Sequence, residues 1–459
     1  MYLAIDIGTS SIKAALGNGE QLWVEQYQAG CSSVGTHSEQ DPKVWLRGVG
    51  MVIPALLAHA GISAKDIKAI SLSSHSPSVV PVDLGGNPLL PCFTWQDRRA
   101  TKQAQRITEL TSEFTDPSFF APKMLWIKEN HPEIYHKTQA FLQPKDYLIH
   151  YLTGEMITDR ASAFFNQANR IPELDQGKLP CPVNNWEIVG LTHASAEELG
   201  LIAGIPVVSG GIDAYCEALG AGLVEEGDFG DVTGTSICLS YCFNDSGEQE
   251  GVVPHVIPER SLTILPMSSG GGTLAWFLDS VVTGIDYADL GAVLNASPPG
   301  ANGLLFLPYL AGERSPIWDE QAKGVFFGVT KAHQKADFLR ALLEGVAFAI
   351  RHNLEILSDR GLRPREVRAT GGGARLTEWN QIKADVTGLP YHQLETVDGA
   401  LLGGILLGAY AVEKRPIAEL VQEYVKVKCV LEPSSCGTIY DVLYDKYKRL
   451  YESTKELMR

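Results

Sequence analysis

Residues 209–222, SGGIDAYCEALGAG, decide how the rest of the chain is interpreted. The apolar run 205–208 precedes two glycines, and an Ala-rich helical pattern follows Asp213. This order predicts a strand, a tight glycine turn and a helix start, which leaves Asp213 at the carboxyl end of the strand. Open α/β sheets bind ligands at such ends, and a carboxylate there can accept a proton from a hydroxyl group. The alternative is that Asp213 only caps the helix.

A glycine turn near the start of the chain is the second informative feature. Apolar runs at 2–7 and 11–16 flank the turn Gly8-Thr9-Ser10. The pattern predicts a β-hairpin whose tight turn presents backbone N–H and hydroxyl groups, with Asp6 at its mouth and Lys13 as the nearest cation. An ordinary surface turn has the same composition, so one such hairpin is open to both interpretations.

The second half of the chain contains a near-copy of this hairpin. Residues 231–241 read DVTGTSICLSY, against DIGTSSIKAAL at 6–16. Each copy has an aspartate, a Gly-Thr-Ser turn and an apolar run. Two copies predict a duplicated fold whose halves face one another and grip a polyphosphate from both sides. The acidic segment 223–230 is the predicted boundary, which gives domains 1–224 and 225–459.

Length and composition limit the classes of protein that the chain can represent. At 459 residues it is too long for one ordinary core, and its 45% hydrophobic and 20% charged residues are typical of a globular protein. The net charge of −16 argues against nucleic acid or an anionic membrane as the main partner. The eight cysteines form no CxxC pair and the N-terminal sequence lacks a basic leader, so we expect a reduced, cytoplasmic chain without a membrane span.

The stretch 73–99 combines polar and aromatic residues in a way that suits a polyol. The residues that form this set are His75, Trp95, Gln96, Asp97 and Arg98. Taken singly, His75 is also typical of a turn or core histidine. Arg98 and Arg99 are also typical of solvated charges at the start of a helix.

Two glycine runs in the second half precede predicted helices. Gly270–Gly272 comes before a helical segment, and the predicted strand 367–370 meets Gly371-Gly372-Gly373-Ala374 before a helix over 378–387. Glycines at the second site allow the backbone to approach a planar base or a ribose closely. The alternatives are a flexible turn for the first run and a helix cap with spare glycines for the second.

Several motifs together resemble those of the FGGY family of carbohydrate kinases. The segment GVFFGVTKAHQKADFLRALLE, residues 324–344, satisfies the family's C-terminal signature at every constrained position. LPYLAGERSP at 307–316 and TGGGARLTEWNQIKADVTGLP at 370–390 are similar to the xylulokinases of the family. The N-terminal signature at 118–130 is nearly complete, with Phe120 where Pro, Ser or Thr is usual. The resemblance covers nearly the whole chain.

The resemblance implies an α/β fold of two ribonuclease-H-like domains, of the actin, hexokinase and Hsp70 type, around a central cleft that binds ATP, Mg²⁺ and a sugar. Asp213 falls at the family's catalytic base, and Asp6 together with Asp213 would hold magnesium. The implied ATP-binding residues are Gly8, Thr9, Ser10, Lys13, Gly234, Thr235, Ser236, Gly372, Gly373, Ala374 and Asn380. The implied substrate-binding residues are Ser74, His75, Trp95, Asp97 and Asp213.

Departures from the family pattern leave the substrate open. Ala214 follows the base where xylulokinases have Asn, which removes one polar contact to the sugar. Residues 95–99 look more like glycerol kinases, but the Arg-Glu pair of those enzymes is absent near 74–76. We expect an ATP-dependent kinase of a ketopentose such as D-xylulose, with glycerol, erythritol, ribulose and gluconate as alternatives, and dimers are common in this family. An actin- or chaperone-like ATPase and a non-catalytic sugar sensor are the alternatives from other classes.

Overall fold

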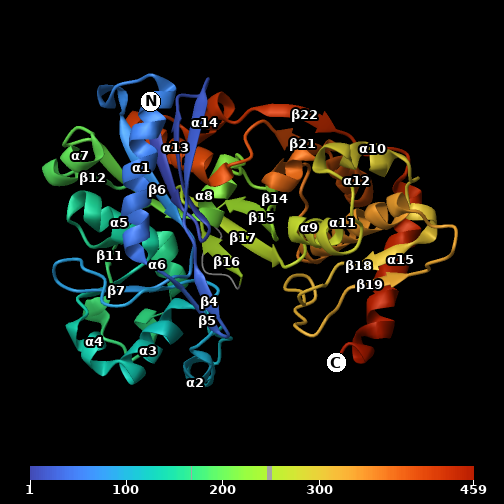
Figure 1. Ribbon diagram of the computed structural model, residues 1–459, viewed down its shortest axis with the longest axis horizontal. Helices are drawn as coiled ribbons and strands as arrows, with labels where there is room; N and C mark the ends of the chain where they lie inside the picture. The colour runs from blue at the N-terminus through green and yellow to red at the C-terminus, as the bar shows by residue number, and fades with distance from the viewer. Residues whose placement is uncertain (167, 245–250) are drawn as a thin grey trace. The chain divides into compact units, whose positions relative to one another are not determined.

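The two predicted hairpins each lie at the centre of a separate β-sheet (Figure 1). The computed structural model describes residues 1–166, 168–244 and 251–459. These residues divide into two compact units. The first contains Met1–Gly220, Val253–Arg260 and Gly399–Tyr424, and the second contains Ala221–Val252, Ser261–Asp398 and Val425–Arg459. The chain first passes from the first unit to the second at Ala221, near the predicted boundary at 224. It then returns to the first unit twice, at Val253–Arg260 and at Gly399–Tyr424, and the sequence did not predict these returns.

The sheet of the first unit has six strands in the order β12-β13-β6-β1-β2-β3. Their bounds are β1 Tyr2–Ile7, β2 Ser11–Gly17, β3 Leu22–Gln28, β6 Ala69–Ser74, β12 Ile188–Gly190 and β13 Pro206–Ile212. Strand β1 pairs antiparallel with β2, with Ile7 opposite Ile12, and it pairs parallel with β6. The predicted N-terminal hairpin is therefore confirmed.

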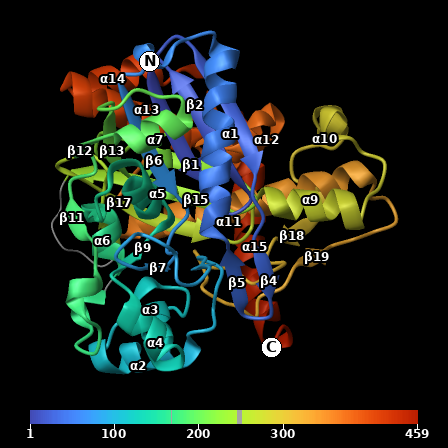
Figure 2. The same cartoon turned by 60° about the vertical axis from the view of Figure 1, so that its left-hand side comes forward.

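Helices cover both faces of this sheet, and the alternation of side chains decides which face Asp6 takes. Helix α1 (Pro42–Ala60) brings Gly48 against Ile12, and α13 (Gly399–Glu413) brings Gly404 against Ala4. Ile12 and Ala4 lie on opposite faces because strand side chains alternate. Asp6 shares the face of Ala4 and therefore points to the α13 side. Figure 2 shows α1 running along the sheet beside β2.

Close packing of α13 on α8 (Asp213–Gly220) explains why the chain returns to the first unit. A Cβ at Gly220 would lie 2.0 Å from the carbonyl oxygen of Gly399, and one at Gly403 would lie 1.9 Å from that of Cys216. Only glycine allows the two backbones to approach so closely. The apolar α13 is therefore held against the helix that begins at Asp213.

In the part of the chain that the structure describes, the first unit also contains seven further helices and three small sheets outside its main sheet. The other helices are α2 Thr101–Thr111, α3 Phe120–Asn130, α4 Pro132–Lys137, α5 Pro144–Thr153, α6 Arg160–Asn166, α7 His193–Leu199 and α14 Ile417–Tyr424. The short strands are β4 Ser32–Val34, β5 His37–Gln40 and β8 Cys92–Phe93 in one sheet, β7 Val80–Val82 with β9 Ala140–Leu142, and β10 Ile157–Asp159 with β11 Cys181–Val183. Helix α3 begins at Phe120 and buries Lys123 completely.

The sheet of the second unit repeats this arrangement. Its seven strands have the order β16-β17-β15-β14-β20-β21-β22. Their bounds are β14 Phe229–Thr233, β15 Ile237–Asn244, β16 Val252–Pro254, β17 Arg260–Met267, β20 Val367–Thr370, β21 Tyr391–Leu394 and β22 Val427–Leu431. Strand β14 pairs antiparallel with β15 and parallel with β20, as β1 pairs with β2 and β6. The predicted duplication of the α/β fold is confirmed.

The helices of the second unit range from six to 25 residues in length. They are α9 Gly271–Ser280, α10 Leu290–Asn295, α11 Lys335–Asp359, α12 Thr377–Thr387 and α15 Gly437–Thr454, with β18 Leu305–Leu307 and β19 Val325–Phe327 as a separate pair. Helix α11 packs on α12, where the indole of Trp379 donates to the carbonyl of Leu343 at 3.2 Å. Among the described residues, no helix is both long enough and apolar enough to cross a bilayer.

Candidate active site

The turn between β1 and β2 is tight because Gly8 closes it. The N–H of Gly8 donates to the carbonyl of Ser11 at 2.9 Å, and a Cβ at Gly8 would lie 2.9 Å from that same oxygen. Thr9 is partly exposed and Ser10 is exposed at the tip. Both residues line a hollow of about 490 Å³ whose other walls come from Gln28, Ala29, Gly30, Cys31, Ser33 and Gln96. The turn therefore presents hydroxyl and N–H groups at an open concave surface.

Asp6 lies two residues before this turn and is partly buried. Its Oδ1 accepts a hydrogen bond of 2.7 Å from the hydroxyl of Ser73, the residue paired with it across β1 and β6. Lys13 is its register partner on β2, so the two side chains share one face of the sheet. The predicted neighbourhood of Asp6 and Lys13 is thus present within the hairpin.

Asp213 is the first residue of α8, directly after β13. Its Oδ1 accepts from the N–H of Ala214 at 2.7 Å, so part of the helix-capping interpretation is correct. Burial and, secondarily, the Asp6 carboxylate together raise the pKa of Asp213 to about 7, against the opposing effect of the Ala214 N–H. The effect of Asp6 on this pKa shows that the fold places Asp6 and Asp213 within electrostatic range of one another.

A β-bulge sets the position from which Asp213 emerges. The pairing of β13 with β6 shifts register between Val208 and Gly211. Gly210 within the bulge has φ +74°, and a Cβ there would lie 1.8 Å from the carbonyl oxygen of Leu72. Asn185 binds both backbone polar groups of Gly210. Its side-chain Nδ2 donates to the Gly210 carbonyl at 2.8 Å, and its backbone carbonyl accepts from the Gly210 N–H at 2.9 Å.

A buried ionic cluster supports the same bulge. The ammonium of Lys145 contacts Asp146 at 2.5 Å and Asp159 at 2.7 Å, and all three side chains are nearly inaccessible to solvent. Asp159 in turn accepts from Nδ2 of Asn185 at 2.8 Å. The two carboxylates hold the pKa of Lys145 above its usual range despite its burial. Sequence reading did not identify this cluster, because its members come from α5, β10 and the loop before β12.

The predicted sugar-side residues separate into buried and exposed members. His75 is buried, and both ring nitrogens face protein atoms, Nδ1 at 2.7 Å from Ser78 Oγ and Nε2 at 3.1 Å from Gln40 Oε1. Burial and, secondarily, Lys123 lower the pKa of His75 to about 3. These contacts fit the alternative of a core histidine, and its contact with a sugar remains a prediction. Trp95 is 38% exposed.

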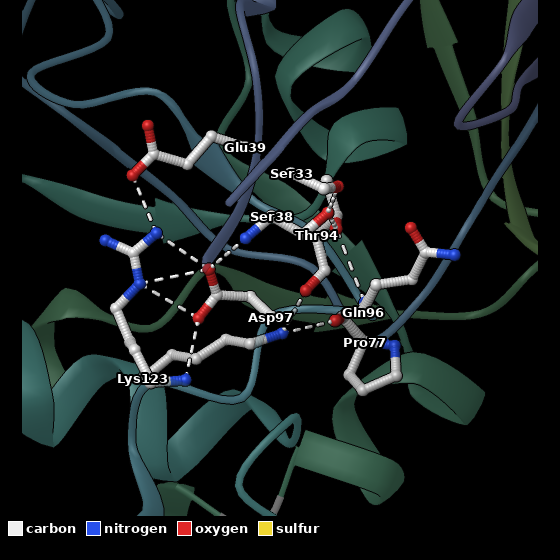
Figure 3. A network of polar contacts seen from close by, with 9 residues as sticks. Ser33, Ser38, Glu39, Pro77, Thr94, Gln96, Asp97 and Lys123 are labelled. Atoms are coloured by element: carbon white, nitrogen blue, oxygen red, sulfur yellow. Dashed lines mark hydrogen bonds and ion pairs between the residues drawn. The ribbon is translucent and has the colours of Figure 1, made fainter. Parts of the chain in front are cut away.

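Asp97 lies at the centre of a polar network that also fixes its neighbours (Figure 3). Its carboxylate accepts from the N–H of Ser38 at 2.7 Å and forms an ion pair with Arg99 at 2.7 Å. Arg99 also pairs with Glu39 at 2.6 Å, so it is not the solvated charge that its sequence allowed. Asp97 is fully buried, which means that its direct contacts are with the protein.

Two further residues show how tightly this region is built. Ser74 is buried; its hydroxyl accepts from the N–H of Lys145 at 3.2 Å and donates to the carbonyl of His75 at 3.3 Å. The ammonium of Lys123 donates to the carbonyls of Pro77 at 2.9 Å and Thr94 at 2.7 Å (Figure 3). Burial lowers the pKa of Lys123 to about 7. The side chains of Ser74 and Lys123 are therefore both inaccessible to solvent.

The second unit contains the other predicted phosphate turn, between β14 and β15. The N–H of Gly234 donates to the carbonyl of Ser236 at 2.9 Å, and Thr235 is exposed. The first turn of α9 packs directly behind it, because the N–H groups of Gly271 and Gly272 donate to the carbonyls of Gly234 and Thr235, each at 2.8 Å. The 270–272 run is therefore a close backbone contact rather than only a flexible turn.

The two hairpins differ by one residue, and this changes the direction of their aspartates. Asp6 precedes Gly8 by two positions, whereas Asp231 precedes Gly234 by three. Because strand side chains alternate, the aspartates point to opposite faces of their hairpins. Asp231 is fully buried and forms an ion pair with Lys383 on α12 at 2.7 Å. Asp231 is thus a structural anchor in the second unit.

The predicted adenosine-side residues cluster at the start of the 3₁₀ turn 372–375. Gly371 has φ +85° and packs on Thr233, where a Cβ would lie 2.6 Å from a carbonyl oxygen. Gly372 is exposed, and a Cβ there would meet no atom within 4 Å. Asn380 is fully buried and its Nδ2 donates to the carbonyl of Ala374 at 2.8 Å, so it supports the turn from behind. Gly373 is partly exposed.

Comparison with known proteins adds independent findings. The chain matches the FGGY family of carbohydrate kinases, N-terminal domain, over residues 1–220, and the C-terminal domain of that family over residues 232–412. It is 31% identical to a xylulose kinase of Staphylococcus epidermidis, with 100% of this chain and 97% of the relative covered. It is 29% identical to a gluconokinase of Bacillus subtilis, with coverages of 92% and 90%.

Solved structures give a consistent result. A kinase from Brucella ovis described as a xylulose kinase has a TM-score of 0.89 and 28% identity, and 99% of each chain is covered. A glycerol kinase from Plasmodium falciparum with ADP has a TM-score of 0.85 and 20% identity, with coverages of 99% and 98%. The second likeness concerns the fold alone.

Proposed function

Because the chain belongs to the FGGY family of carbohydrate kinases, we propose that it transfers the γ-phosphate of ATP to a hydroxyl of a ketopentose, with D-xylulose as the leading substrate. One observation carries the proposal. Asp213, at the carboxyl end of β13, lies close enough to Asp6 for the two carboxylates to shift a pKa. Asp6 itself stands two residues before the phosphate turn that begins at Gly8.

In this proposal Asp213 is the base that receives the proton of the attacking hydroxyl. A pKa near 7 suits that role, because a substantial fraction of the carboxyl group is then ionised at neutral pH and is still basic enough to accept a proton. The Ala214 N–H fixes one carboxylate oxygen and leaves the other to face the substrate. Phosphoryl transfer depends mainly on alignment and charge neutralisation, so this orientation is as important as the basicity.

The same pair of carboxylates fits a magnesium ion. Mg²⁺ is usually held by one or two carboxylates together with phosphate oxygens and water. Among the described residues, no group of three or more His, Cys, Asp or Glu side chains is arranged to hold a metal. In this proposal Asp6 and Asp213 would hold it with the nucleotide, and the ion would neutralise charge on the phosphate oxygens. Ser73 keeps the Asp6 carboxylate in a fixed direction by its 2.7 Å hydrogen bond.

The nucleotide would be bound by two separate sets of residues. In the first unit, the turn residues Gly8, Thr9 and Ser10, with Lys13 nearby, would contact phosphate oxygens. In the second unit, a further turn would do the same, and the glycine segment would accept the adenosine through its exposed backbone. The residues of this second set are Gly234, Thr235, Ser236, Gly372, Gly373 and Ala374, with Asn380 supporting the segment.

Two observations favour a neutral sugar over a sugar acid. The two arginines of the stretch 73–99 are already paired, Arg99 with Asp97 and Glu39 and Arg98 with Asp116. A carboxylate substrate would need an available cation. Relatives named xylulose kinase also align over nearly the full chain. The gluconokinase relative keeps sugar acids as the second candidate.

The proposal is tested by measuring ADP release with D-xylulose, D-ribulose, pentitols, glycerol, erythritol and gluconate, each with Mg²⁺ and ATP. We expect turnover that depends on added sugar and is highest with a ketopentose. ATP hydrolysis that is independent of every sugar would point instead to a switch ATPase of related fold. Sugar binding without any phosphate transfer would point to a non-catalytic sensor.

A further inference from the structure

The side chain of Gln40, at the end of β5, joins the first phosphate turn to the buried His75. Gln40 is 2% exposed. Its Nε2 donates to the carbonyls of Thr9 at 3.1 Å and Gly8 at 3.4 Å. Its Oε1 accepts from the indole N–H of Trp45 at 2.9 Å and lies 3.1 Å from Nε2 of His75. One amide group therefore contacts four partners from three segments of the chain.

The chemistry of these partners fixes the direction of the amide. Backbone carbonyls only accept hydrogen bonds and an indole N–H only donates, so the nitrogen of Gln40 must face the turn and its oxygen must face Trp45. The same oxygen then requires a hydrogen on Nε2 of His75. Nδ1 of His75 is left as the acceptor for the hydroxyl of Ser78, 2.7 Å away. The ring is consequently the neutral Nε2–H tautomer.

Holding the carbonyls of Gly8 and Thr9 also directs the donors of the turn. In a trans peptide the C=O and the following N–H point in opposite directions. When Gln40 binds the carbonyls of Gly8 and Thr9, the N–H groups of Thr9 and Ser10 must point away from Gln40. Cys31 reinforces this arrangement, because its Sγ donates to the Thr9 carbonyl at 3.2 Å.

The second unit offers an internal comparison. There the carbonyls at the corresponding positions, Gly234 and Thr235, are held by the backbone N–H groups of Gly271 and Gly272, each at 2.8 Å. The same two carbonyls are therefore fixed in both Gly-Thr-Ser turns, once by two main-chain donors and once by the amide of Gln40. The duplicated fold reaches the same result by different chemical groups.

We propose that Gln40 is a positioning residue for phosphate transfer, which orients the N–H groups of Thr9 and Ser10 toward the nucleotide and couples this turn to His75. The inference rests on the proposed kinase function. Donors that are fixed before the reaction stabilise developing charge without reorganisation, and loss of one such donor typically lowers turnover by about 10²- to 10³-fold. Gln40 acts through the turn, so its removal should affect kcat more than the KM of the sugar.

Gln40→Met is the test variant, because Met has a similar length and volume but no donor or acceptor of comparable strength. Trp45→Phe is the matched control, since it removes one partner of the Gln40 oxygen and leaves the nitrogen on the turn. We expect Gln40→Met to lower kcat by about 100-fold, with less than about a threefold change in the KM of D-xylulose, and Trp45→Phe to stay within about fivefold of the wild-type kcat. Equal losses in both variants, or a Gln40→Met enzyme with at least a third of wild-type kcat, would overturn the inference.

A second measurement does not depend on activity or on the folding of a variant. The ¹⁵N chemical shifts of the His75 ring in the wild-type protein report which nitrogen carries the hydrogen. We expect a protonated Nε2 and an unprotonated Nδ1 across pH 6–8, and a hydrogen on Nδ1 would contradict the hydrogen-bond assignment. If the wild-type protein transfers no phosphate to any sugar, the proposed function fails, while the NMR result still decides the connection between Gln40 and His75.

Discussion

Replacing Asp213 with Asn separates the chemical role of this residue from its effect on folding. Asn has nearly the same shape, and its Oδ1 can still accept the N–H of Ala214 that Asp213 accepts at 2.7 Å. The variant loses only the negative charge and the ability to take a proton. We expect phosphate transfer to fall by at least about 10²- to 10⁴-fold, while nucleotide binding stays near the wild-type level.

The magnitude of the folding effect follows from the pKa. The pKa of Asp213 rises from 3.8 to about 7 in the folded protein. A rise of about three units corresponds to about 4 kcal/mol that the ionised side chain costs the folded state, as an upper limit. Asp213 keeps part of its surface in solvent, so we expect Asp213→Asn to raise the free energy of unfolding by about 1–3 kcal/mol at pH 8.

The sign of the pH dependence is fixed by the same shift. Between pH 3.8 and about 7 the folded protein binds more protons at Asp213 than the unfolded chain, so this residue makes wild-type stability fall as pH rises through that window. The stabilising effect of Asp213→Asn should therefore grow from pH 4 to pH 7 and stay constant above it.

Two assays check this reasoning. Coupled ADP release with D-xylulose measures transfer, and thermal unfolding of both proteins at pH 4.5, 6 and 8 measures stability, with an expected rise in Tm of roughly 1–3 °C at pH 8. A variant with near-normal turnover would remove Asp213 from its role as base. A difference in Tm that does not change with pH would refute the raised pKa.

Three further predictions concern other parts of the structure. Gly210→Ala should lower the free energy of unfolding by at least about 2 kcal/mol and reduce turnover, because its Cβ would overlap the Leu72 carbonyl of β6 at 1.8 Å. Urea unfolding measures the loss, with Gly61→Ala, where a Cβ meets no atom within 4 Å, as the control. Equal losses in the two variants would show that the overlap is not the cause. Lys383→Met should lower the free energy of unfolding by about 3–5 kcal/mol, because it leaves the carboxylate of Asp231 buried without its ion-pair partner. If the broken pair is the cause, the double variant Lys383→Met/Asp231→Leu should regain stability, and thermal unfolding measures this. The kcat/KM for D-xylulose should rise with pH and level off above about 7, as Asp213 loses its proton; a flat profile from pH 5 to 9 would argue against it.

Local sequence patterns predicted the elements that carry the site. The glycine turn at 8–10 and its copy at 234–236 both join antiparallel strands, and the helix after Asp213 begins at the expected residue. These features depend on short-range properties, namely the alternation of apolar residues and the need for glycine in tight turns. They are encoded within about ten residues of each other, so a linear reading can recover them.

Contacts between distant segments could not be predicted in this way. Gln40 reads as a polar residue before a helix, yet its amide lies between a turn some 30 residues earlier and a histidine 35 residues later. Arg99 is typical of a solvated charge by its sequence, but it pairs with Asp97 and Glu39, and tertiary packing buries Asp97 completely. A charge becomes buried only when its partners surround it, and those partners come from other strands and loops.

The sequence by itself determined that the chain has two related α/β halves, where the two Gly-Thr-Ser turns lie, and that the carboxylate of Asp213 follows directly after a strand. The tertiary structure alone decided that Asp6 lies near enough to Asp213 to raise its pKa while Asp231 turns inward to Lys383. The reason is physical: periodicity fixes the conformation of a strand, but the direction and protonation of a side chain depend on what the folded chain packs against it.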